Sequence, residues 1–179
     1  DEVNMTIKMG PKCFPGIIDL HEGRTIQEEQ IHHICEYIDN RYDCADFRMV
    51  SIIRTLYSYK HLLSESTLER IKKTVLGFKY WMDEPGVDSM CFWSENHQIL
   101  FASVEYLAGQ LFPDDLFTNA SMSGLEHLEK AKIRILRWLK YRFTYGFTEW
   151  HSNTYYEEDI APLAILIDFC RDEEIVVKS

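Results

Sequence analysis

The sequence lacks most of the signatures by which a function is usually recognised. Its five cysteines include no C-x-x-C pair, so they predict neither a zinc site nor a fully paired disulfide framework. No G-x-G-x-x-G or G-x-x-x-x-G-K run is present, which excludes the common glycine-rich phosphate loops. No apolar run approaches the roughly 18 residues of a membrane span, so no membrane partner is expected.

Basic residues are also scarce. Lysine and arginine number 19 against 29 aspartates and glutamates, which gives a formal net charge of −10. This balance argues against general nucleic-acid binding, because neutralising phosphates needs positive charge. A hydrophobic fraction of 46% is ordinary for a folded protein, and 179 residues suffice for one domain. Localisation stays open, although two Asn-X-Ser/Thr sequons, at Asn4 and Asn119, favour secretion.

Helical periodicity is the pattern that the sequence does contain. Apolar residues recur three and four positions apart in six segments, whereas the alternation typical of strands is hard to find. The sixth segment contains Pro162, which predicts a kink there or a later start near Asp159. Residues 1–24 are expected to form an extended lead-in. The six segments begin after Thr25, near Asp46, near Ser66, at Ser94, at Ser123 and near Tyr155.

Charge is distributed unequally among these segments. Residues 124–145 carry eight charges, whereas 95–111 carry two and 160–170 carry one. A helix that is apolar nearly all round must be covered on most sides, so 95–111 and 160–170 belong to inner helices and 124–145 to an outer one. We therefore predict an all-α fold of serial antiparallel helical hairpins, of the (α/α) toroid type. Six helices are too few to close such a ring, so the domain of residues 1–179 is expected to be incomplete or open, as a segment of a larger protein.

Polar and aromatic residues precede the expected inner helices. Serial antiparallel hairpins place the starts of all inner helices on one rim, so residues distant in the chain are expected to converge there. Flat rings beside hydrogen-bonding groups suit a sugar, which has apolar faces and a hydroxyl edge. The structural alternative is that the polar groups cap these helices and the tryptophans cover their ends. The residues expected on the rim are Trp93, Glu95, Asn96, His97, Glu149, Trp150, His151, Asn153, Tyr155, Tyr156 and Glu158.

Asn96 and His97 form the most informative pair. In the first turn of a helix the positive end of the dipole disfavours an imidazolium, so His97 is expected to be a neutral base at neutral pH. Asn96 beside it can donate to a substrate carboxylate and favour an enolate-like state. A tyrosine from the next inner helix, Tyr155 or Tyr156, completes the acid–base set.

Two runs around these residues resemble a known family. FWSENHQ at 92–98 and TEWHSNTYYEE at 148–158 are similar to the α/α-toroid polysaccharide lyases, such as the alginate lyases and the glycosaminoglycan lyases. The resemblance covers residues 92–158. It implies β-elimination of a uronic-acid-containing polysaccharide or oligosaccharide, with no essential metal, and we expect no cofactor.

The resemblance also implies roles for single residues. Asn96 matches the neutraliser of the uronate carboxylate, and His97 matches the base or carboxylate partner. Tyr155 or Tyr156 matches the proton carrier at the leaving oxygen. Some members have an arginine or a glutamate beside the tyrosine, and the matching candidates here are Arg142 and Glu149.

The acidic run at 157–159 favours a second hypothesis, a glycoside hydrolase on the same scaffold. Such an enzyme flanks the scissile bond with two carboxylates, one as acid and one as base or nucleophile. The pair that this hypothesis names is Glu95 with Glu149 or Glu158. A third hypothesis is a non-catalytic helical array that binds carbohydrate or protein through the same aromatic residues.

Overall fold

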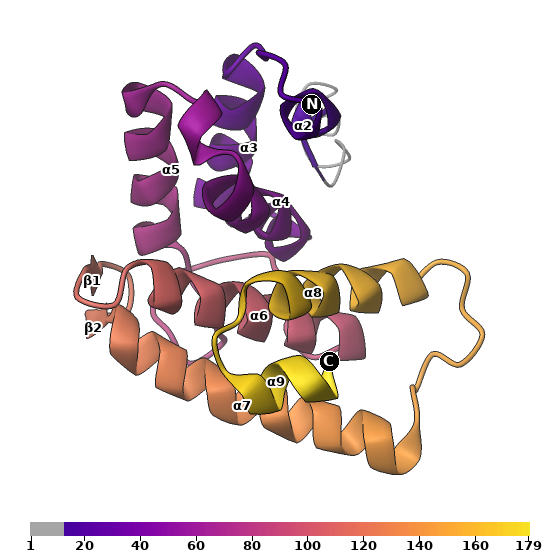
Figure 1. Ribbon diagram of the computed structural model, residues 1–179. Helices are drawn as coiled ribbons and strands as arrows, with labels where there is room; N and C mark the ends of the chain where they lie inside the picture. The colour runs from indigo at the N-terminus through magenta and orange to yellow at the C-terminus, as the bar shows by residue number, and fades with distance from the viewer. Residues whose placement is uncertain (1–12) are drawn as a thin grey trace.

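The computed structural model describes residues 13–179, which are mostly helical (Figure 1). The all-α class predicted from the sequence is confirmed. The small antiparallel sheet pairs Leu116 with Ser123 and Phe117 with Met122. In chain order the elements are α2 (Ile17–His21), α3 (Glu29–Asp39), α4 (Ala45–Ser58), the 3₁₀ turn η1 (Lys60–Leu62), α5 (Glu65–Gly77), α6 (Glu95–Leu111), β1 (Leu116–Phe117), β2 (Met122–Ser123), α7 (Gly124–Tyr145), α8 (Tyr156–Phe169) and α9 (Glu173–Lys178).

Local capping signals locate some helix starts and miss others. Ser123 and Glu126 form the reciprocal capping box expected before α7. The first expected helix begins at Glu29 instead of directly after Thr25. Its Glu28 carboxylate accepts from the backbone nitrogen of Ser64, 2.9 Å away, instead of capping its own helix. A contact between two hairpin elements has therefore replaced the local one.

The lead-in expected to be extended contains a short helix, α2. Phe14 and Leu20 are each only 1% exposed, and Ile17 packs against the same core. These apolar residues are three positions apart, so a helical turn directs all three toward the core. The prediction of an extended lead-in is wrong for this stretch, and its first half, residues 1–12, lies outside the described residues.

The three inner helices α4, α6 and α8 run parallel to one another. Asp46 bonds His97 where α4 and α6 begin, and the Tyr57 hydroxyl donates to the carbonyl of Leu107 near their other ends, at 3.0 Å. The Tyr57 ring stacks on Phe169, at the end of α8, with ring centroids 4.7 Å apart. The starts of the three inner helices therefore lie at the same end of the bundle.

Helix α6 is the centre of the core. Every residue from Glu95 to Gln110 except Gln98 is buried, and α4, α7 and α8 all pack against it. Helix α8 is less covered than its apolar sequence predicts, since Ile160 and Ile167 are 62% and 51% exposed. Among residues 13–179 no helix is both long and apolar enough to cross a membrane.

Candidate functional site

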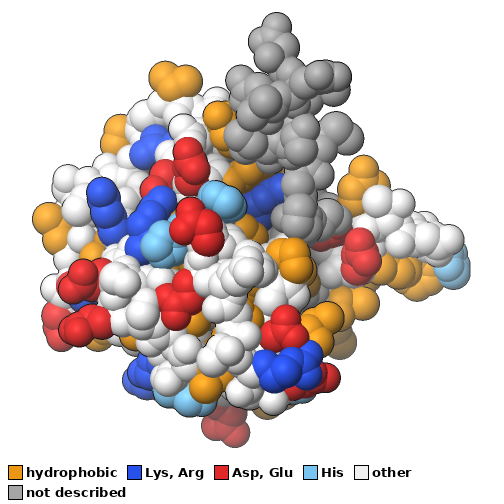
Figure 2. All heavy atoms as spheres, turned by 90° about the horizontal axis from the view of Figure 1, so that it is seen from above, with side chains coloured by type: hydrophobic (Ala, Val, Ile, Leu, Met, Phe, Trp, Pro, Cys, Tyr) orange, Lys and Arg blue, Asp and Glu red, His pale blue; other side chains and the backbone are white. Residues whose placement is uncertain are grey.

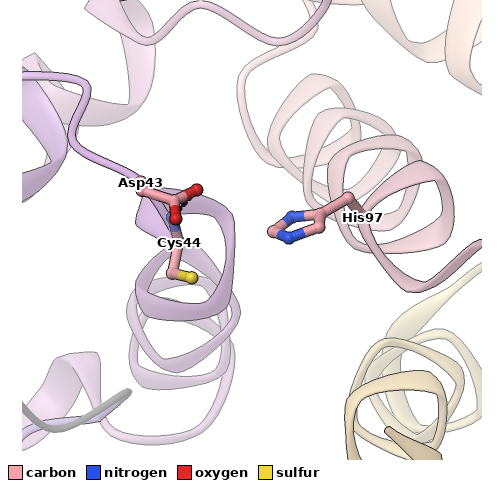
Figure 3. Close-up of side chains that lie close together, drawn as sticks. All are labelled: Asp43, Cys44 and His97. Carbon is pink, nitrogen blue, oxygen red and sulfur yellow. Dashed lines mark hydrogen bonds between the residues drawn. The ribbon is translucent and has the colours of Figure 1, made fainter. Parts of the chain in front are cut away.

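A buried carboxylate holds His97 in place. Nδ1 of His97, in the first turn of α6, lies 2.5 Å from Oδ2 of Asp46, in the first turn of α4. The imidazole also packs edge-on against Phe47, and its ring faces the turn that enters α4 (Figure 3). Burial raises the pKa of the Asp46 carboxyl, against the opposing effect of the bond to His97. Nε2 of His97 has no hydrogen-bond partner within residues 13–179, so this nitrogen is available to bind a proton or another group.

Sequence reasoning missed Asp46 as a site residue. It recognised the start of a helix near position 46 but gave the aspartate no role. The available signal was an acidic residue in the first turn of an otherwise apolar inner helix, at the same helical level as Asn96 and His97. The helix dipole alone explains such an acid, so the pairing became visible only in the fold.

Asn96 is fixed with its amide nitrogen unused. Its Oδ1 accepts from the hydroxyl of Ser94 at 2.5 Å and from the backbone nitrogen of His97 at 2.7 Å. The Ser94 side chain makes no capping bond to the backbone of α6, so the capping interpretation does not hold for it. Within the described residues the Asn96 amide nitrogen has no partner, which leaves two N–H donors beside His97.

Glu95 and Arg142 neutralise each other inside the fold. Their side chains form an ion pair and are only 4% and 17% exposed. Glu95 also accepts from the backbone nitrogen and the hydroxyl of Thr148, which ties the loop after α7 to the start of α6. Both residues were expected to contact substrate. In this arrangement their charged groups face each other, and their role is to anchor that loop.

The two tyrosines at the start of α8 differ in their surroundings. The Tyr156 hydroxyl accepts from the backbone nitrogen of His151 at 2.5 Å, and its ring packs edge-on against Phe147. Tyr155 is 44% exposed, and its hydroxyl has no partner among residues 13–179. Tyr155 is therefore the more accessible of the two tyrosines, although no contact in the described chain joins it to His97.

The aromatic residues of the rim are presented to solvent. Trp93 is 73% exposed and Trp150 is 65% exposed, so neither covers a helix end. The ring of His151 lies 5.0 Å from that of Trp150, and Asn153 is exposed in the same loop. Glu158, by contrast, is 4% exposed. The aromatic part of the predicted rim is thus accessible, whereas most of its acidic part is not.

Asp159, near the start of α8, and Glu149, in the loop before α8, form a second pair of carboxylates. Asp159 is 2% exposed, and burial raises the pKa of its carboxyl to about 6, helped by Glu149 and opposed by Arg142. Both Asp159 oxygens and Oε2 of Glu149 are buried without a hydrogen-bond partner. The sequence interpretation treated Asp159 only as part of an acidic run, because the burial that distinguishes it from Glu157 has no local signal.

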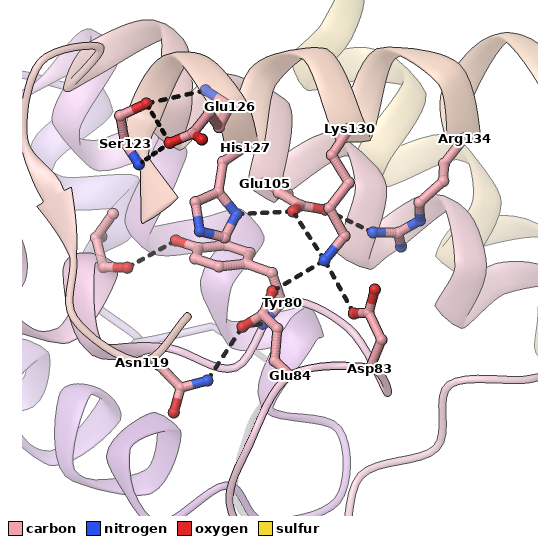
Figure 4. Close-up of polar contacts among 11 residues, drawn as sticks. Tyr80, Asp83, Glu84, Glu105, Asn119, Ser123, Glu126, His127, Lys130 and Arg134 are labelled. Carbon is pink, nitrogen blue, oxygen red and sulfur yellow. Dashed lines mark hydrogen bonds and ion pairs between the residues drawn. The ribbon is translucent and has the colours of Figure 1, made fainter. Parts of the chain in front are cut away.

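A buried polar network joins the C-terminal half of α6 to cations of α7 (Figure 4). Glu105 is fully buried, accepts from Nδ1 of His127 at 2.7 Å and pairs with Arg134 at 2.5 Å. Lys130 pairs with Asp83 at 2.9 Å. The network connects α6 and α7, although Nε2 of His127 and one terminal nitrogen of Arg134 are buried without a hydrogen-bond partner among the described residues. Possible ligand atoms of Glu84, Glu105 and His127 lie within 4.8 Å of one another, but the Lys130 ammonium already pairs with both carboxylates, so we treat this network as structural.

Asn119 belongs to the same network. Its amide nitrogen donates to Glu84 at 3.1 Å, and its oxygen accepts from Arg41 at 2.6 Å. A glycan on this sequon would cost these bonds, so Asn119 is a poor argument for secretion. The other sequon, at Asn4, lies outside the described residues.

No protein-family model, curated protein or solved structure matches this chain.

The face seen from above carries acidic and basic side chains interspersed, with no broad basic area over the described part of the chain (Figure 2). Any functional conclusion therefore rests on the residues of the site itself.

Proposed function

We propose that the protein is a polysaccharide lyase that acts on a uronic-acid polymer by β-elimination, on an open or incomplete (α/α) toroid scaffold. The observation that carries the proposal is the Asp46–His97 pair with Asn96 beside it. Asp46 occupies Nδ1 of His97, so the basic lone pair is on Nε2. The donors of Asn96 are unused on the same helical turn.

The proposed β-elimination needs three side chains. Asn96 donates hydrogen bonds to the uronate carboxylate, which stabilises negative charge on the neighbouring carbon. Nε2 of His97 takes the proton from that carbon as a ring double bond forms. The glycosidic bond on the next carbon breaks, and the leaving oxygen takes its proton from the Tyr155 hydroxyl. The tyrosinate then regains a proton from solvent, and the imidazolium of His97 loses one to solvent.

The register of the inner helices supports Tyr155 in this role. Asp46 meets His97 at the starts of α4 and α6, and Gln110 donates to the carbonyl of Phe169 at 2.8 Å near the ends of α6 and α8. The stretch from His97 to Gln110 is as long as that from Tyr156 to Phe169. Parallel helices of equal rise therefore bring the start of α8 to the level of His97.

In this proposal Asn96 does most of the work of recognising the carboxylate. Four of the six cations of α7 are used in ion pairs within the fold, so α7 supplies little basic surface. These pairs are Lys130 with Asp83, Lys132 with Asp172, Arg134 with Glu105 and Arg142 with Glu95. An anionic polymer is then held through the fixed amide and through stacking on Trp93 and Trp150.

The test is product formation on a panel of uronic-acid polymers. Elimination creates an unsaturated sugar that absorbs in the ultraviolet, and His97→Ala should abolish this absorbance. His33→Ala is the matched control, because His33 is exposed on α3 and should leave the rate unchanged. If the wild-type chain forms no unsaturated product from any polymer, or if His97→Ala retains full activity, the proposal is wrong.

One observation favours hydrolysis as the second candidate. Asp159 has a carboxyl pKa raised to about 6 and lies beside Glu149, which is the division between acid and base that glycosidases use. The acid is Asp159 in this case, in place of Glu95 or Glu158. Hydrolysis produces reducing ends without ultraviolet absorbance, and it should be lost in Asp159→Asn while surviving in His97→Ala.

A further inference from the structure

Three chemically different ligand groups meet where α4 begins. A carboxylate oxygen of Asp43, Sγ of Cys44 and a ring nitrogen of His97 lie within 4.8 Å of one another. Asp43 and Cys44 come from the turn that enters α4, and His97 faces them from the first turn of α6 (Figure 3). Asp43 is exposed, Cys44 is half-buried and His97 is buried, so the cluster has one side open to solvent.

The backbone directs these groups toward His97. Cys44 is the N-cap residue of α4 and has a left-handed conformation, with φ of 62°. Oδ1 of Asp43 accepts from the backbone nitrogen of Cys44 at 3.1 Å, which leaves Oδ2 to act as a ligand. The side chains of Asp43 and Cys44 therefore project from the same turn.

Asp46 supplies an independent observation. It is fully buried, its Oδ2 holds Nδ1 of His97, and its Oδ1 is buried without a hydrogen-bond partner. Metal-binding histidines almost always donate their second ring nitrogen to such a group, because this fixes the ring and increases the basicity of the ligand nitrogen. Nε2 of His97 is the nitrogen left for a cation.

We propose that Asp43, Cys44 and His97 bind Zn²⁺ or a similar borderline-soft divalent cation. A thiolate, an imidazole and a carboxylate are the ligand types that zinc takes in proteins, whereas calcium and magnesium prefer oxygen alone. Tetrahedral zinc spaces its ligand atoms about 3.5 Å apart, so the three side chains close by roughly 1 Å on binding. Three protein ligands leave the fourth position to water.

The cation and the proposed catalytic base use the same atom. Zinc on Nε2 of His97 removes the lone pair that takes the substrate proton, so zinc should inhibit the lyase reaction. This consequence rests on the proposed function. The binding itself does not, and it is measured without substrate.

The binding test uses the full chain after treatment with a chelator that is then removed. Titration with Co²⁺ should give one bound equivalent and a thiolate-to-cobalt charge-transfer band, and Zn²⁺ should displace the cobalt. Cys44→Ser should abolish the band and weaken zinc binding at least 10-fold. Asp46→Asn should weaken it about 10- to 100-fold, as loss of an outer partner does.

Two further variants separate the site from general effects. Cys91→Ser is the matched control, because Cys91 is also half-buried but belongs to no ligand cluster, and it should bind both metals like the wild type. Asp43→Asn changes an exposed residue and tests the carboxylate in a variant that should fold normally. Absence of a charge-transfer band in the wild type, or a band that survives in Cys44→Ser, would overturn the proposal, whatever the outcome of the lyase assay.

Discussion

The Nδ1 atom of His97 lies 2.5 Å from Oδ2 of Asp46, a fully buried carboxylate on the neighbouring inner helix. This relationship fixes the orientation of the imidazole, and while Asp46 is ionised it favours the tautomer with the proton on Nδ1, since an ionised carboxylate only accepts. Residues 51 positions apart in the chain are thereby in direct contact.

Replacing Asp46 by asparagine should therefore damage catalysis more than folding. The amide can turn its NH₂ group toward Nδ1, which favours the tautomer with the proton on Nε2. We expect the kcat for unsaturated product to fall by about 10²- to 10⁴-fold while KM changes little. Initial rates measured by ultraviolet absorbance, with circular dichroism to verify folding, test this. A loss of stability with unchanged kcat would show that Asp46 is only structural.

The exposed tryptophans should contribute to binding without contributing to stability. Trp93→Ala and Trp150→Ala should each weaken oligosaccharide binding by about 1 kcal/mol or more, because each ring offers a flat face to a sugar. Trp138 is the matched control, since it is 5% exposed and its Nε1 donates to the carbonyl of Glu95 at 2.8 Å. Trp138→Phe should lower the melting temperature instead. If calorimetry shows equal affinities for the wild type and both alanine variants, the aromatic rim does not bind sugar.

Some of this fold could be predicted because its causes are local in the chain. The start of α7 directly after Ser123 follows from the capping box of Ser123 and Glu126, which lies within one helical turn. The bond from Ser64 to Glu28 could not be predicted, since it joins residues 36 positions apart and displaces a local cap. A contact between hairpins depends on how they pack, which periodicity does not specify.

The residues of the candidate site also fall into two groups, those that a local sequence pattern indicates and those that only the packing of the helices reveals. Asn96 and His97 could be proposed from the sequence because a polar pair at the start of an apolar helix is unusual. The side chains that form hydrogen bonds and ion pairs with residues of the site could not be predicted. Asp46 orients the imidazole of His97, and Arg142 pairs with Glu95, through contacts between different helices. Asp159 is buried whereas Glu157, two positions earlier, is exposed, and which of these positions faces the core depends on how α8 packs.

Gly109 should tolerate no side chain, because the backbone of α7 lies directly against it. A Cβ at this position would lie 2.3 Å from the backbone oxygen of Gly124, an atom that cannot move without shifting α7. Gly109→Ala should therefore destabilise the protein by roughly 1–3 kcal/mol or more in denaturant unfolding. Gly77 is the control, since a Cβ there meets only the Thr118 hydroxyl at 3.8 Å. Gly77→Ala should be neutral or stabilising by up to about 1 kcal/mol.

Glu105 should be among the most sensitive charged positions for stability. Glu105→Gln keeps the shape but removes the charge that compensates Arg134, which pairs with it at 2.5 Å. Removing one member of a buried ion pair typically costs about 3–5 kcal/mol, and we expect a loss of that size in urea unfolding. Glu129→Gln, on the exposed face of α7, should change stability by less than about 0.5 kcal/mol. Similar values for the two variants would mean that the network contributes little.

Asp159 should make stability depend on pH between about 4 and 6. Its pKa is raised from 3.8 to about 6 in the fold, so in this range the folded state binds more protons than the unfolded state. Stability is then highest below the unfolded pKa and falls as pH rises through the folded pKa, because ionising a buried, unpartnered carboxyl is unfavourable.

Asp159→Asn removes that penalty and loses no hydrogen bond, since both oxygens are unpartnered. The variant should therefore be more stable than the wild type above about pH 6, by up to about 3 kcal/mol, and the difference should shrink toward pH 4. Urea unfolding at several pH values measures this difference directly. Glu173→Gln, at an exposed acid in the first turn of α9, serves as the control and should show no such gain. A difference that grows toward acidic pH would have the wrong sign and would mean that Asp159 is stabilised as an anion, with Arg142 outweighing its burial.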